Sequence, residues 1–481
     1  MSDTVNIFID NVPVAANKGE TILSAAIRNG INIPNLCYHK KISHTGSCRL
    51  CIVRIEGNPK IVTSCTTPAE EGQKITAFSP ELEAARKTVL DLQLSDHNDD
   101  CINCYKDGTC ELQDMAFQYD LGTDKRKYPR ITTKADKCLD TTSQVVDFDS
   151  SKCIQCGRCI KACDEIQGKG VLSFMHRGIK STVKTGTELW VDSTCDGCGE
   201  CVQICPVGAL SLKPVNGKRI RSKDVEKSVN TTCPYCGVGC QLQVGTKKDV
   251  VNGVASQDRI IKITGVDTVP NQGSTCVKGR FGTDFVNHPD RLRKPLIRKD
   301  GKLVEVEWAE AIEYTAKRFD EIKKKNGAEA LAGLSSARVT NENNYLFQKF
   351  VRSVMGSPNV DHCARLCHAS TVAGLAISFG SGAMTNSIAE LEYAKVILVT
   401  GSNTTETHPV ISTYIKRAVQ KHGAKLIVVD PRQIDLTRYA TMWLRQRNGT
   451  DIAWLNGMVQ AIIANGWENK DFIANHTENY E

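Results

Sequence analysis

Cysteine recurs through the first half of this sequence at the spacing of metal ligands. The chain has 481 residues and 22 cysteines, and twenty of the cysteines fall into six sets with metal-ligand character. Five sets follow one another along the chain: Cys37, Cys48, Cys51 and Cys65; His97, Cys101, Cys104 and Cys110; Cys153, Cys156, Cys159 and Cys163; Cys195, Cys198, Cys201 and Cys205; Cys233, Cys236, Cys240 and Cys276. The sixth set is Cys367 with the histidine after it, and Cys138 has no partner set. Five iron–sulfur sites in a row would form a path for single electrons.

Many cysteines can also indicate disulfides in a secreted protein. Here the C-x-x-C repeats, the chain length and the lack of an export signal favour metal in a reducing compartment. The first ten residues have neither a basic stretch nor twin arginines, and no segment approaches the roughly 20 apolar residues of a membrane span. We therefore expect a cytoplasmic protein without a membrane span.

Composition and charge indicate several folded domains. The chain is 41% hydrophobic and 24% charged, and at this length we expect three or more domains. The formal net charge is +7, but thiolate-bound iron–sulfur clusters are anionic and would offset it. Nucleic acid is therefore not an expected partner.

Two of the sets have the most specific spacing in the chain, C-x2-C-x2-C-x3-C. Two such runs are typical of the bacterial two-cluster ferredoxin, in which the fourth cysteine of each run binds the other cluster. We therefore predict two crossed [4Fe–4S] sites. They are the Cys153 group (Cys153, Cys156, Cys159 and Cys205) and the Cys195 group (Cys195, Cys198, Cys201 and Cys163). Asp164 stands where proline is usual, but that proline shapes a turn and is not a ligand.

The Cys37 group (Cys37, Cys48, Cys51 and Cys65) resembles the [2Fe–2S] site of a β-grasp ferredoxin domain. Three ligands lie close together and the fourth is distant, with gaps longer than in plant-type ferredoxins. Gly46 and Ser47 would allow the backbone to wrap a cluster and direct amides at its sulfurs. A zinc site is the alternative, although zinc prefers paired knuckles and this set has one C-x2-C pair.

The His97 group (His97, Cys101, Cys104 and Cys110) combines one histidine with three cysteines at ligand spacing. It resembles the [4Fe–4S] site of the electron-input domains of complex I and iron-only hydrogenases. Histidine in place of a thiolate removes a negative charge and should raise the reduction potential. A lone histidine is usually structural, and a zinc site with the same four ligands is the alternative.

The Cys233 group (Cys233, Cys236, Cys240 and Cys276) resembles the N-terminal [4Fe–4S] signature of molybdopterin oxidoreductases. The segment Val277-Lys278-Gly279-Arg280 also fits this family. Within the resemblance, Lys278 matches the lysine that lies between cluster and pterin, which implies a catalytic and cofactor-binding role. The alternative is a surface lysine.

Cys367 is the candidate catalytic residue. From its small, apolar neighbours alone, it would be a buried structural thiol. The segment resembles formate dehydrogenases of the molybdopterin family, in which a cysteine or selenocysteine followed by histidine ligates the metal. Cys367 and His368 match those positions, and His368 is expected to orient the site and move a proton. Related nitrate reductases usually have methionine after the cysteine. Cys363 is expected to be structural.

The later part of the chain predicts an α/β domain. Strands are expected at 5–9, 52–55, 396–401 (buried) and 425–430, and helices at 21–28, 81–94, 305–325, 343–355 and 410–422. The succession 396–401, 410–422 and 425–430 predicts a βαβ unit in a parallel sheet. A strand that ends in glycine suits the nucleotide end of a ligand. By the family resemblance, a guanine dinucleotide pterin would meet Gly401, Ser402, Asn403, Thr407, His408, Asp430 and Arg432.

The expected fold class is multidomain, α/β and α+β. We expect a β-grasp [2Fe–2S] ferredoxin domain (1–78), a [4Fe–4S] domain with one histidine and three cysteine ligands (79–125), a two-[4Fe–4S] ferredoxin domain (126–212, with a connector at 126–150), a linker (213–228), a [4Fe–4S] domain like the N-terminal domain of molybdopterin oxidoreductases (229–290) and a partial molybdopterin-binding α/β domain (291–481).

Essentially the whole chain resembles the catalytic subunit of a cytoplasmic, multi-cluster, cysteine-containing formate dehydrogenase. The resemblance implies reversible oxidation of formate to CO2. It implies one [2Fe–2S] and four [4Fe–4S] clusters and Mo or W held by bis-molybdopterin guanine dinucleotide. It also implies electron-accepting partner subunits, such as a flavin NAD(P)H module, a ferredoxin-linked partner or a hydrogenase.

Members of this family continue well beyond the region that this chain resembles, so the chain is expected to be truncated or completed by a separate polypeptide. A second hypothesis is a non-catalytic wiring or scaffold subunit of a complex I-like or hydrogenase complex, with a degenerate pterin domain. The Cys367-His368 pair argues against it, because a degenerate site needs neither residue. Nitrate reductase is a third hypothesis, which His368 disfavours.

Overall fold

The computed structural model describes residues 4–131, 139–213, 220–251 and 254–480. The chain forms two compact units, Met1–Ser387 and Ile388–Glu481. The predicted multidomain α/β and α+β fold class is confirmed. Among the described residues, no helix is long and apolar enough to cross a membrane. Cys138 lies outside the described residues.

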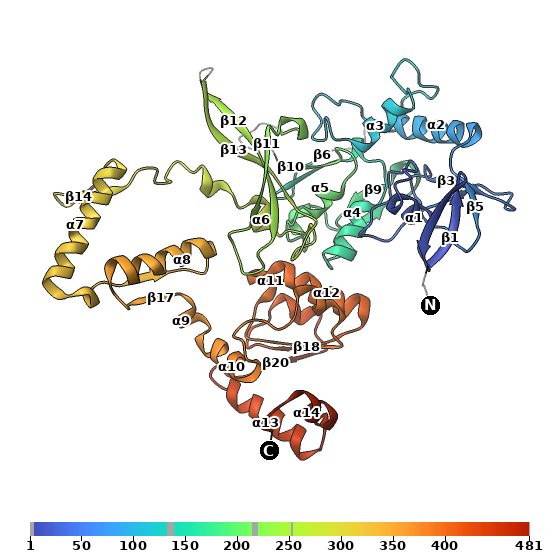
Figure 1. Ribbon diagram of the computed structural model, residues 1–481. Coiled ribbons are helices and arrows are strands. Elements are labelled where there is room, and N and C mark those ends of the chain that lie inside the picture. Colours follow the sequence, from blue (N-terminus) through green and yellow to red (C-terminus); the bar gives the residue numbers. More distant parts are fainter. Residues whose placement is uncertain (1–3, 132–138, 214–219, 252–253, 481) are drawn as a thin grey trace. The chain divides into compact units, whose positions relative to one another are not determined.

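The N-terminal domain is a five-stranded sheet with one helix beside it (Figure 1). Its strands are β1 (Thr4–Ile9), β2 (Val12–Asn17), β3 (Ile52–Ile55), β4 (Val62–Thr63) and β5 (Lys74–Thr76), in the order β2-β1-β5-β3-β4. β1 and β5 are parallel, and the other pairs are antiparallel. α1 (Ile22–Arg28) begins after Thr21, whose side chain accepts a hydrogen bond from the Ser24 amide. Its buried residues share one apolar core with Ile7, Ile9 and Val53.

Helix α2 (Pro80–Ser95) is attached to this sheet by a buried arginine. The helix begins after Ser79, which caps it, and Pro80 occupies the first turn, where its missing N–H costs nothing. Arg86 is fully buried, and its guanidinium donates to the carbonyl oxygens of Leu50, Ile52 and Ala77 at 3.0, 2.7 and 2.7 Å. One side chain therefore joins the helix to the backbone at β3 and just after β5, two neighbouring strands. α3 (Glu111–Gln118) follows.

The ferredoxin domain consists of short strands around two cysteine-bearing turns. β6 (Leu139–Asp140), β7 (Val146–Asp149) and β10 (Leu210–Leu212) form an antiparallel sheet in the order β10-β7-β6, and β8 (Ser173–Met175) pairs with β9 (Thr182–Lys184). The connector expected over 126–150 is wrong where β6 and β7 form. These strands are short and interrupted by aspartates, but Val146 and Phe148 are buried in the core.

Each cysteine run turns into a short helix through a glycine. Gly157 precedes α4 (Arg158–Lys161) with φ of 77°, and Gly199 precedes α5 (Glu200–Ile204) with φ of 73°. This left-handed conformation favours glycine. At Gly199 a Cβ would also lie only 2.4 Å from the Cδ of Arg280, so the position has no room for a side chain.

The chain after Cys163 shows what replaces the usual proline. Asp164 lies in a π-type turn, Ala162–Ile166, that continues α4. The next residue, Glu165, accepts hydrogen bonds from the amide and hydroxyl of Ser43 at 2.6 and 2.5 Å. The turn therefore joins the ferredoxin domain to the loop between Cys37 and Cys48.

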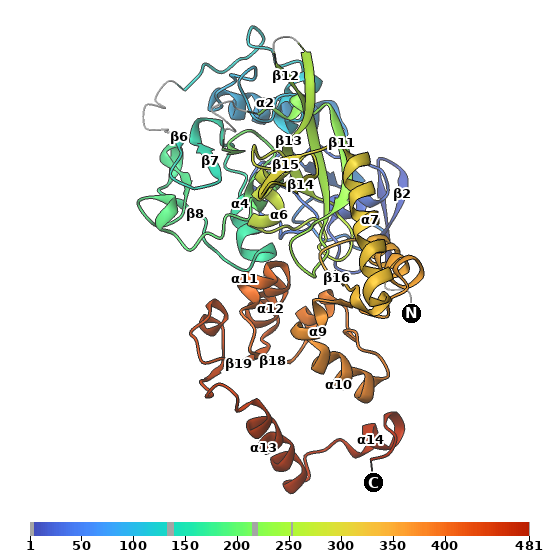
Figure 2. The same ribbon diagram turned by 90° about the vertical axis from the view of Figure 1, so that its left-hand side faces the viewer.

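The next domain is an antiparallel sheet of β11 (Lys227–Thr232), β12 (Gln241–Val251) and β13 (Val254–Gly265), followed by α6 (Val277–Phe281) (Figure 2). β11 begins inside the linker expected over 213–228, because its residues pair with β12 over their whole length. Lys40 and Lys41 of the N-terminal domain both bind Asp267, at 2.5 and 2.6 Å. This domain is thus attached to the Cys37–Cys48 loop as well.

The rest of the first unit contains β14 (Leu296–Lys299), β15 (Lys302–Glu305), α7 (Trp308–Asn326), β16 (Gly333–Ser335), α8 (Asn341–Lys349), β17 (Val360–His362), α9 (Ala364–Cys367) and α10 (Ala369–Phe379). The helix expected over 305–325 starts later, at Trp308, because Lys302–Glu305 pairs with β14 as a hairpin. The helix expected over 343–355 consists of α8 and a π-type turn, Phe350–Met355.

The second unit contains the predicted βαβ arrangement. β18 (Val396–Thr400), β19 (Lys425–Val429) and β20 (Met442–Leu444) form a parallel sheet in that order, with α11 (Thr404–Thr407) and α12 (Pro409–His422) between the first two strands. α13 (Asp451–Ala464) and α14 (Lys470–His476) follow. The βαβ prediction is confirmed. The prediction that this strand is buried is wrong for one of its faces. Ile397 and Val399 of β18 are buried, whereas Val396 and Leu398 are exposed on the other face.

We expect Arg86→Met to lower the free energy of unfolding of the N-terminal domain by about 3–5 kcal/mol, because buried carbonyl oxygens would lose their donors. Hydrogen exchange of amides in β3 and β5 would measure the loss. Arg54→Met is the control, because Arg54 binds Glu81 on the surface. Equal exchange rates in the Arg86 variant and wild type would contradict this role.

Candidate metal centres

The four thiols of the Cys37 group converge. The Cys48 amide donates to the sulfur of Cys37 at 3.5 Å, and the Leu36 amide donates to the sulfur of Cys48 at 3.4 Å. Hydrogen bonds from Cys48 and Cys65, together with the amides of Cys48 and Ser47, lower the pKa of Cys37 to about 2. A hydrogen bond with Cys65 likewise lowers the pKa of Cys51 to about 7. Backbone amides after Gly46 therefore donate to cysteine sulfur, as predicted from the position of Gly46 and Ser47 in this loop.

The three cysteines of the His97 group lie near one another after α2. Burial raises the pKa of Cys110 to about 11, and the neighbouring Cys104 and Cys101 contribute to the increase. His97 is buried directly beyond the end of α2, where its amide donates to the carbonyl of Leu94. A Cβ at Gly208 would lie 2.1 Å from the sulfur of Cys104. This group therefore lies directly against the ferredoxin domain.

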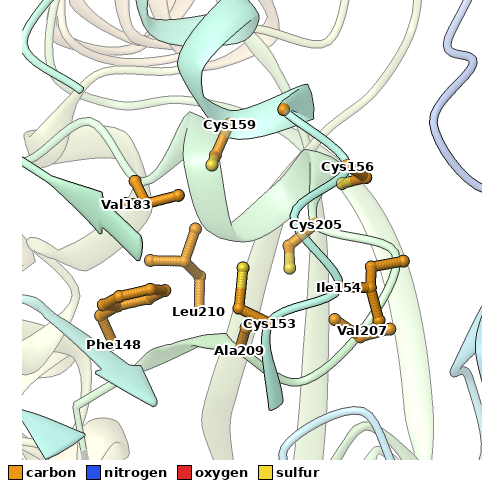
Figure 3. A pocket seen from close by; sticks show the side chains of 11 residues that line it. Phe148, Cys153, Ile154, Cys156, Cys159, Val183, Cys205, Val207, Ala209 and Leu210 are labelled. Atoms are coloured by element: carbon orange, nitrogen blue, oxygen red, sulfur yellow. The ribbon is translucent and has the colours of Figure 1, made fainter. Parts of the chain in front are cut away.

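The Cys153 group surrounds one small cavity (Figure 3). Cys153, Cys156 and Cys159 come from the first run, and Cys205 comes from the second. Apolar side chains close the cavity: Phe148, Ile154, Val183, Val207, Ala209 and Leu210. The structure thus brings the fourth cysteine of the second run to the first run, in the crossed arrangement that the spacing predicts.

The Cys195 group has the complementary arrangement. Burial raises the pKa of Cys163, and the nearby Cys195 and Asp164 raise it further. Burial also raises the pKa of Cys198, with Cys163 among the contributing neighbours. Cys195 is exposed, whereas Cys205 of the other group is buried. Cys201 lies near enough to both Cys163 and Cys205 for each to raise its pKa, so the two groups are neighbours.

The Cys233 group gathers around the turn before β12 and the start of α6. Burial raises the pKa of Cys240 to about 12, and Cys233, Cys236 and Cys276 add to this. A Cβ at Gly279 would lie 3.4 Å from the sulfur of Cys233. Lys278 is exposed on α6, next to these thiols in sequence.

Cys367 and His368 lie at the end of α9, and both are exposed. The interpretation of Cys367 as a buried structural thiol is therefore wrong. Cys363 begins the same turn, and its sulfur accepts a hydrogen bond from the Ala337 amide at 3.3 Å. Cys363 thus joins α9 to the loop after β16, in keeping with a structural role.

The predicted nucleotide-contact residues follow the carboxyl ends of β18 and β19. Gly401 has φ of 58°, and its amide donates to the Val429 carbonyl at 3.1 Å. Asp430 is buried, and its carboxylate accepts from the Arg432 amide at 2.8 Å. The other predicted contacts, Ser402, Asn403, Thr407 and His408, lie in or beside α11. These residues belong to the second unit, whereas Cys367 and His368 belong to the first.

Buried charged residues beside the cysteines are a feature that ligand spacing does not indicate. Arg158 lies between Gly157 and Cys159 and forms a bidentate pair with Glu111. Arg280, after Cys276, donates to the carbonyl of Cys198 at 2.7 Å. The sequence signal that could have found these two arginines is their position close to candidate cysteine ligands.

Five family models match successive segments of the chain. They are a 2Fe-2S iron-sulfur cluster binding domain (2–80), the NADH-ubiquinone oxidoreductase-G iron-sulfur binding region (86–125), the ferredoxin-like domain of NADH-quinone oxidoreductase subunit 3 (143–211), the molybdopterin oxidoreductase Fe4S4 domain (226–288) and molybdopterin oxidoreductase (291–477).

Curated relatives have similar sequences over nearly the whole chain. NADPH-Fe(3+) oxidoreductase subunit alpha of Geobacter sulfurreducens is 34% identical over 99% of this chain and 54% of the relative. "Putative formate dehydrogenase YrhE" of Bacillus subtilis is 32% identical over 99% of this chain and 52% of the relative. A subunit of the NADH-quinone oxidoreductase of Rhizobium meliloti is 36% identical over 96% and 52%. The chain spans about half the length of these relatives.

Among solved structures, an NAD+-reducing [NiFe]-hydrogenase in the H2-reduced state matches 45% of this chain and 92% of that chain, with 30% identity and a TM-score of 0.41. The segments that match the molybdopterin oxidoreductase Fe4S4 domain and molybdopterin oxidoreductase thus follow, along this chain, segments that match iron–sulfur domains of NADH-quinone oxidoreductase.

Proposed function

We propose that this chain is the iron–sulfur and metal-binding part of a formate dehydrogenase catalytic subunit, which interconverts formate and CO2. The observation that carries the proposal is the pair Cys367-His368, exposed at the end of α9 within the segment that matches the molybdopterin oxidoreductase model. A relative named as a putative formate dehydrogenase, 32% identical over 99% of this chain, supports the proposal.

The Cys153 group suits an iron–sulfur cluster, because thiols from both cysteine runs line one cavity. We assign a [2Fe–2S] cluster to the Cys37 group and a [4Fe–4S] cluster to each of the His97, Cys153, Cys195 and Cys233 groups. Such clusters supply one-electron transfer when bound. The chain's contribution is to hold the thiols, to direct amides such as that of Cys48 at sulfur, and to surround the sites with apolar side chains.

The second unit suits the nucleotide end of a bis-molybdopterin guanine dinucleotide. Gly401 and Asp430 follow neighbouring parallel strands, so their loops lie at one edge of the sheet, where such ligands bind. When bound, the Mo or W group would exchange two electrons with formate. In our assignment Cys367 would supply a soft thiolate ligand and His368 would hold and move a proton. Lys278, which follows Cys276 by two residues, would link this group to the Cys233 group.

A second candidate is an electron-wiring subunit without its own substrate site. Two relatives favour it, the NADPH-Fe(3+) oxidoreductase subunit alpha and the NADH-quinone oxidoreductase subunit of Rhizobium meliloti. Under either proposal the partners are electron-accepting or electron-donating subunits, such as a flavin NAD(P)H module, a ferredoxin-linked protein or a hydrogenase.

Metal analysis of the protein purified anaerobically from its host separates the two candidates. For a formate dehydrogenase we expect Mo or W in amounts comparable with the protein, together with formate-dependent reduction of a dye. A protein with full iron and sulfide but neither Mo nor W would be the wiring subunit.

We expect Cys367→Ala to lower formate oxidation more than about 100-fold, since even residues behind metal ligands are worth about 10–100-fold. The electron paramagnetic resonance signals of the iron–sulfur clusters should stay unchanged. Cys363→Ala is the control, because it removes a neighbouring thiol with a structural contact, and its turnover should be close to wild type. Normal turnover in the Cys367 variant would exclude the assignment.

The crossed ligand assignment makes a separate prediction. Cys205→Ser should weaken or remove the same resonance signal as Cys159→Ser, and Cys163→Ser the same signal as Cys201→Ser. Each loss should correspond to about four irons per chain, the content of one [4Fe–4S] cluster. If Cys205→Ser instead affected the signal lost in Cys201→Ser, the sites would be uncrossed.

A further inference from the structure

We propose that two arginines with buried guanidinium groups, Arg158 paired with Glu111 and Arg280 beside Glu200, are positioning residues that hold the two ferredoxin sites against their neighbouring metal sites. The inference rests on the proposed iron–sulfur role of the cysteine groups. It assigns to four side chains a task beyond cluster binding, which is to set the separation across which an electron moves between sites.

The two pairs occupy matching positions of the ferredoxin repeat. Arg158 lies in Cys156-Gly-Arg-Cys159, and Glu200 lies in Cys198-Gly-Glu-Cys201. Both residues begin a short helix after a left-handed glycine, and they are only 4% and 5% exposed. The charge is positive in the first repeat and negative in the second. Each therefore needs a partner of opposite sign from outside the repeat.

The first pair joins the Cys153 group to the His97 group. Two nitrogens of the Arg158 guanidinium donate to the two carboxylate oxygens of Glu111, at 2.7 and 2.8 Å. Glu111 directly follows Cys110, and its amide donates to the carbonyl of Pro206 at 3.0 Å. Pro206 directly follows Cys205. The segments that carry Cys110, Cys159 and Cys205 are thus fastened together by one residue.

The second pair joins the Cys195 group to the Cys233 group. Arg280 lies on α6, one turn after Cys276, and its Nη2 is 3.7 Å from the Oε2 of Glu200. Its Nε donates to the carbonyl of Cys198 at 2.7 Å, and its Nη1 donates to Gln203 Oε1 at 2.9 Å. The arginine lies so close to the Gly199 turn that even a Cβ would clash with it.

Burial distinguishes these pairs from an ordinary surface ion pair. Arg54 and Glu81 make a similar bidentate contact, at 3.0 and 2.6 Å, but their side chains are 36% and 58% exposed. Exposed pairs contribute little to structure. In the proposed pairs the Arg158 and Arg280 side chains are 5% and 2% exposed, although that of Glu111 is 45% exposed. A buried guanidinium that keeps its acceptors fixes geometry, and one that loses them is left as an uncompensated buried charge. Arg158 and Arg280 can therefore hold the segments of two neighbouring sites at a set separation.

The step that depends on this separation is simple. One electron leaves a site, which is oxidised, and arrives at the adjacent site, which is reduced, and no covalent bond changes. Because such transfer slows steeply with distance, a small displacement of one domain should slow it without removing either cluster.

The test uses pulse radiolysis of the oxidised, anaerobically purified protein, with rapid-freeze paramagnetic resonance to identify which sites hold the injected electron. Iron and sulfide content is measured on every variant. Arg158→Gln should slow redistribution between the His97 and Cys153 groups several-fold, because electron transfer through protein falls off with each added ångström of separation. Arg280→Gln should do the same between the Cys195 and Cys233 groups. Arg54→Gln is the matched control and should not slow either.

Charge exchange provides the second arm. The double variant R158E/E111R should recover at least about half of the lost rate if the pair itself is the cause, as in a double-mutant cycle. If a glutamine variant loses iron, Arg158→Lys and Arg280→Lys replace it, since lysine keeps the charge but not the forked geometry. Wild-type redistribution rates with full iron in the glutamine or lysine variants would overturn the inference. If the wild-type protein itself is found to contain neither iron nor sulfide, that result overturns the proposed function and not this inference alone.

Discussion

The thiol of Cys205 meets the first cysteine run of the ferredoxin domain, and Cys163 meets the second run. This exchange is the constraint on which the first unit depends, because neither run supplies all four cysteines of a candidate site. The pairing of β7 with β10 brings the ends of the two runs together, and Phe148 and Leu210 from these strands close the Cys153 cavity. This short sheet thus fixes the relative position of candidate ligands that are far apart in sequence.

Small cysteine-rich domains have little apolar core to hold their loops. In this chain, buried arginines provide part of that stabilisation. Arg86 satisfies three backbone carbonyl oxygens around the N-terminal sheet, and Arg280 satisfies those of Cys198 and Ile263. Guanidinium groups suit this task because they carry several donors in a fixed plane. The domains are joined by more exposed polar contacts, between Glu165 and Ser43 and between Asp267 and both Lys40 and Lys41.

Local patterns in the sequence predict the parts of the structure that depend on local chemistry. The crossed cysteine sets follow from C-x2-C-x2-C-x3-C, and the βαβ unit follows from two apolar strands around a helix that ends at Gly423. Other parts depend on tertiary partners. β6 and β7 are too short to have a clear period, and Arg158 resembles any surface arginine until Glu111 is placed beside it. Helix α7 starts later than its sequence pattern predicts because a hairpin with β14 takes up the preceding residues.

The exchange of Cys163 and Cys205 also bears on how such a chain could evolve. Most of its domains are contiguous segments, so gene fusion or loss could add or remove each one separately. The ferredoxin pair cannot be divided in this way. A deletion of either repeat would remove three candidate ligands from one site and the fourth from the other, and a single repeat by itself would lack a donor for its fourth position. The pair must therefore be inherited, transferred or lost as one module, even though its sequence looks like two.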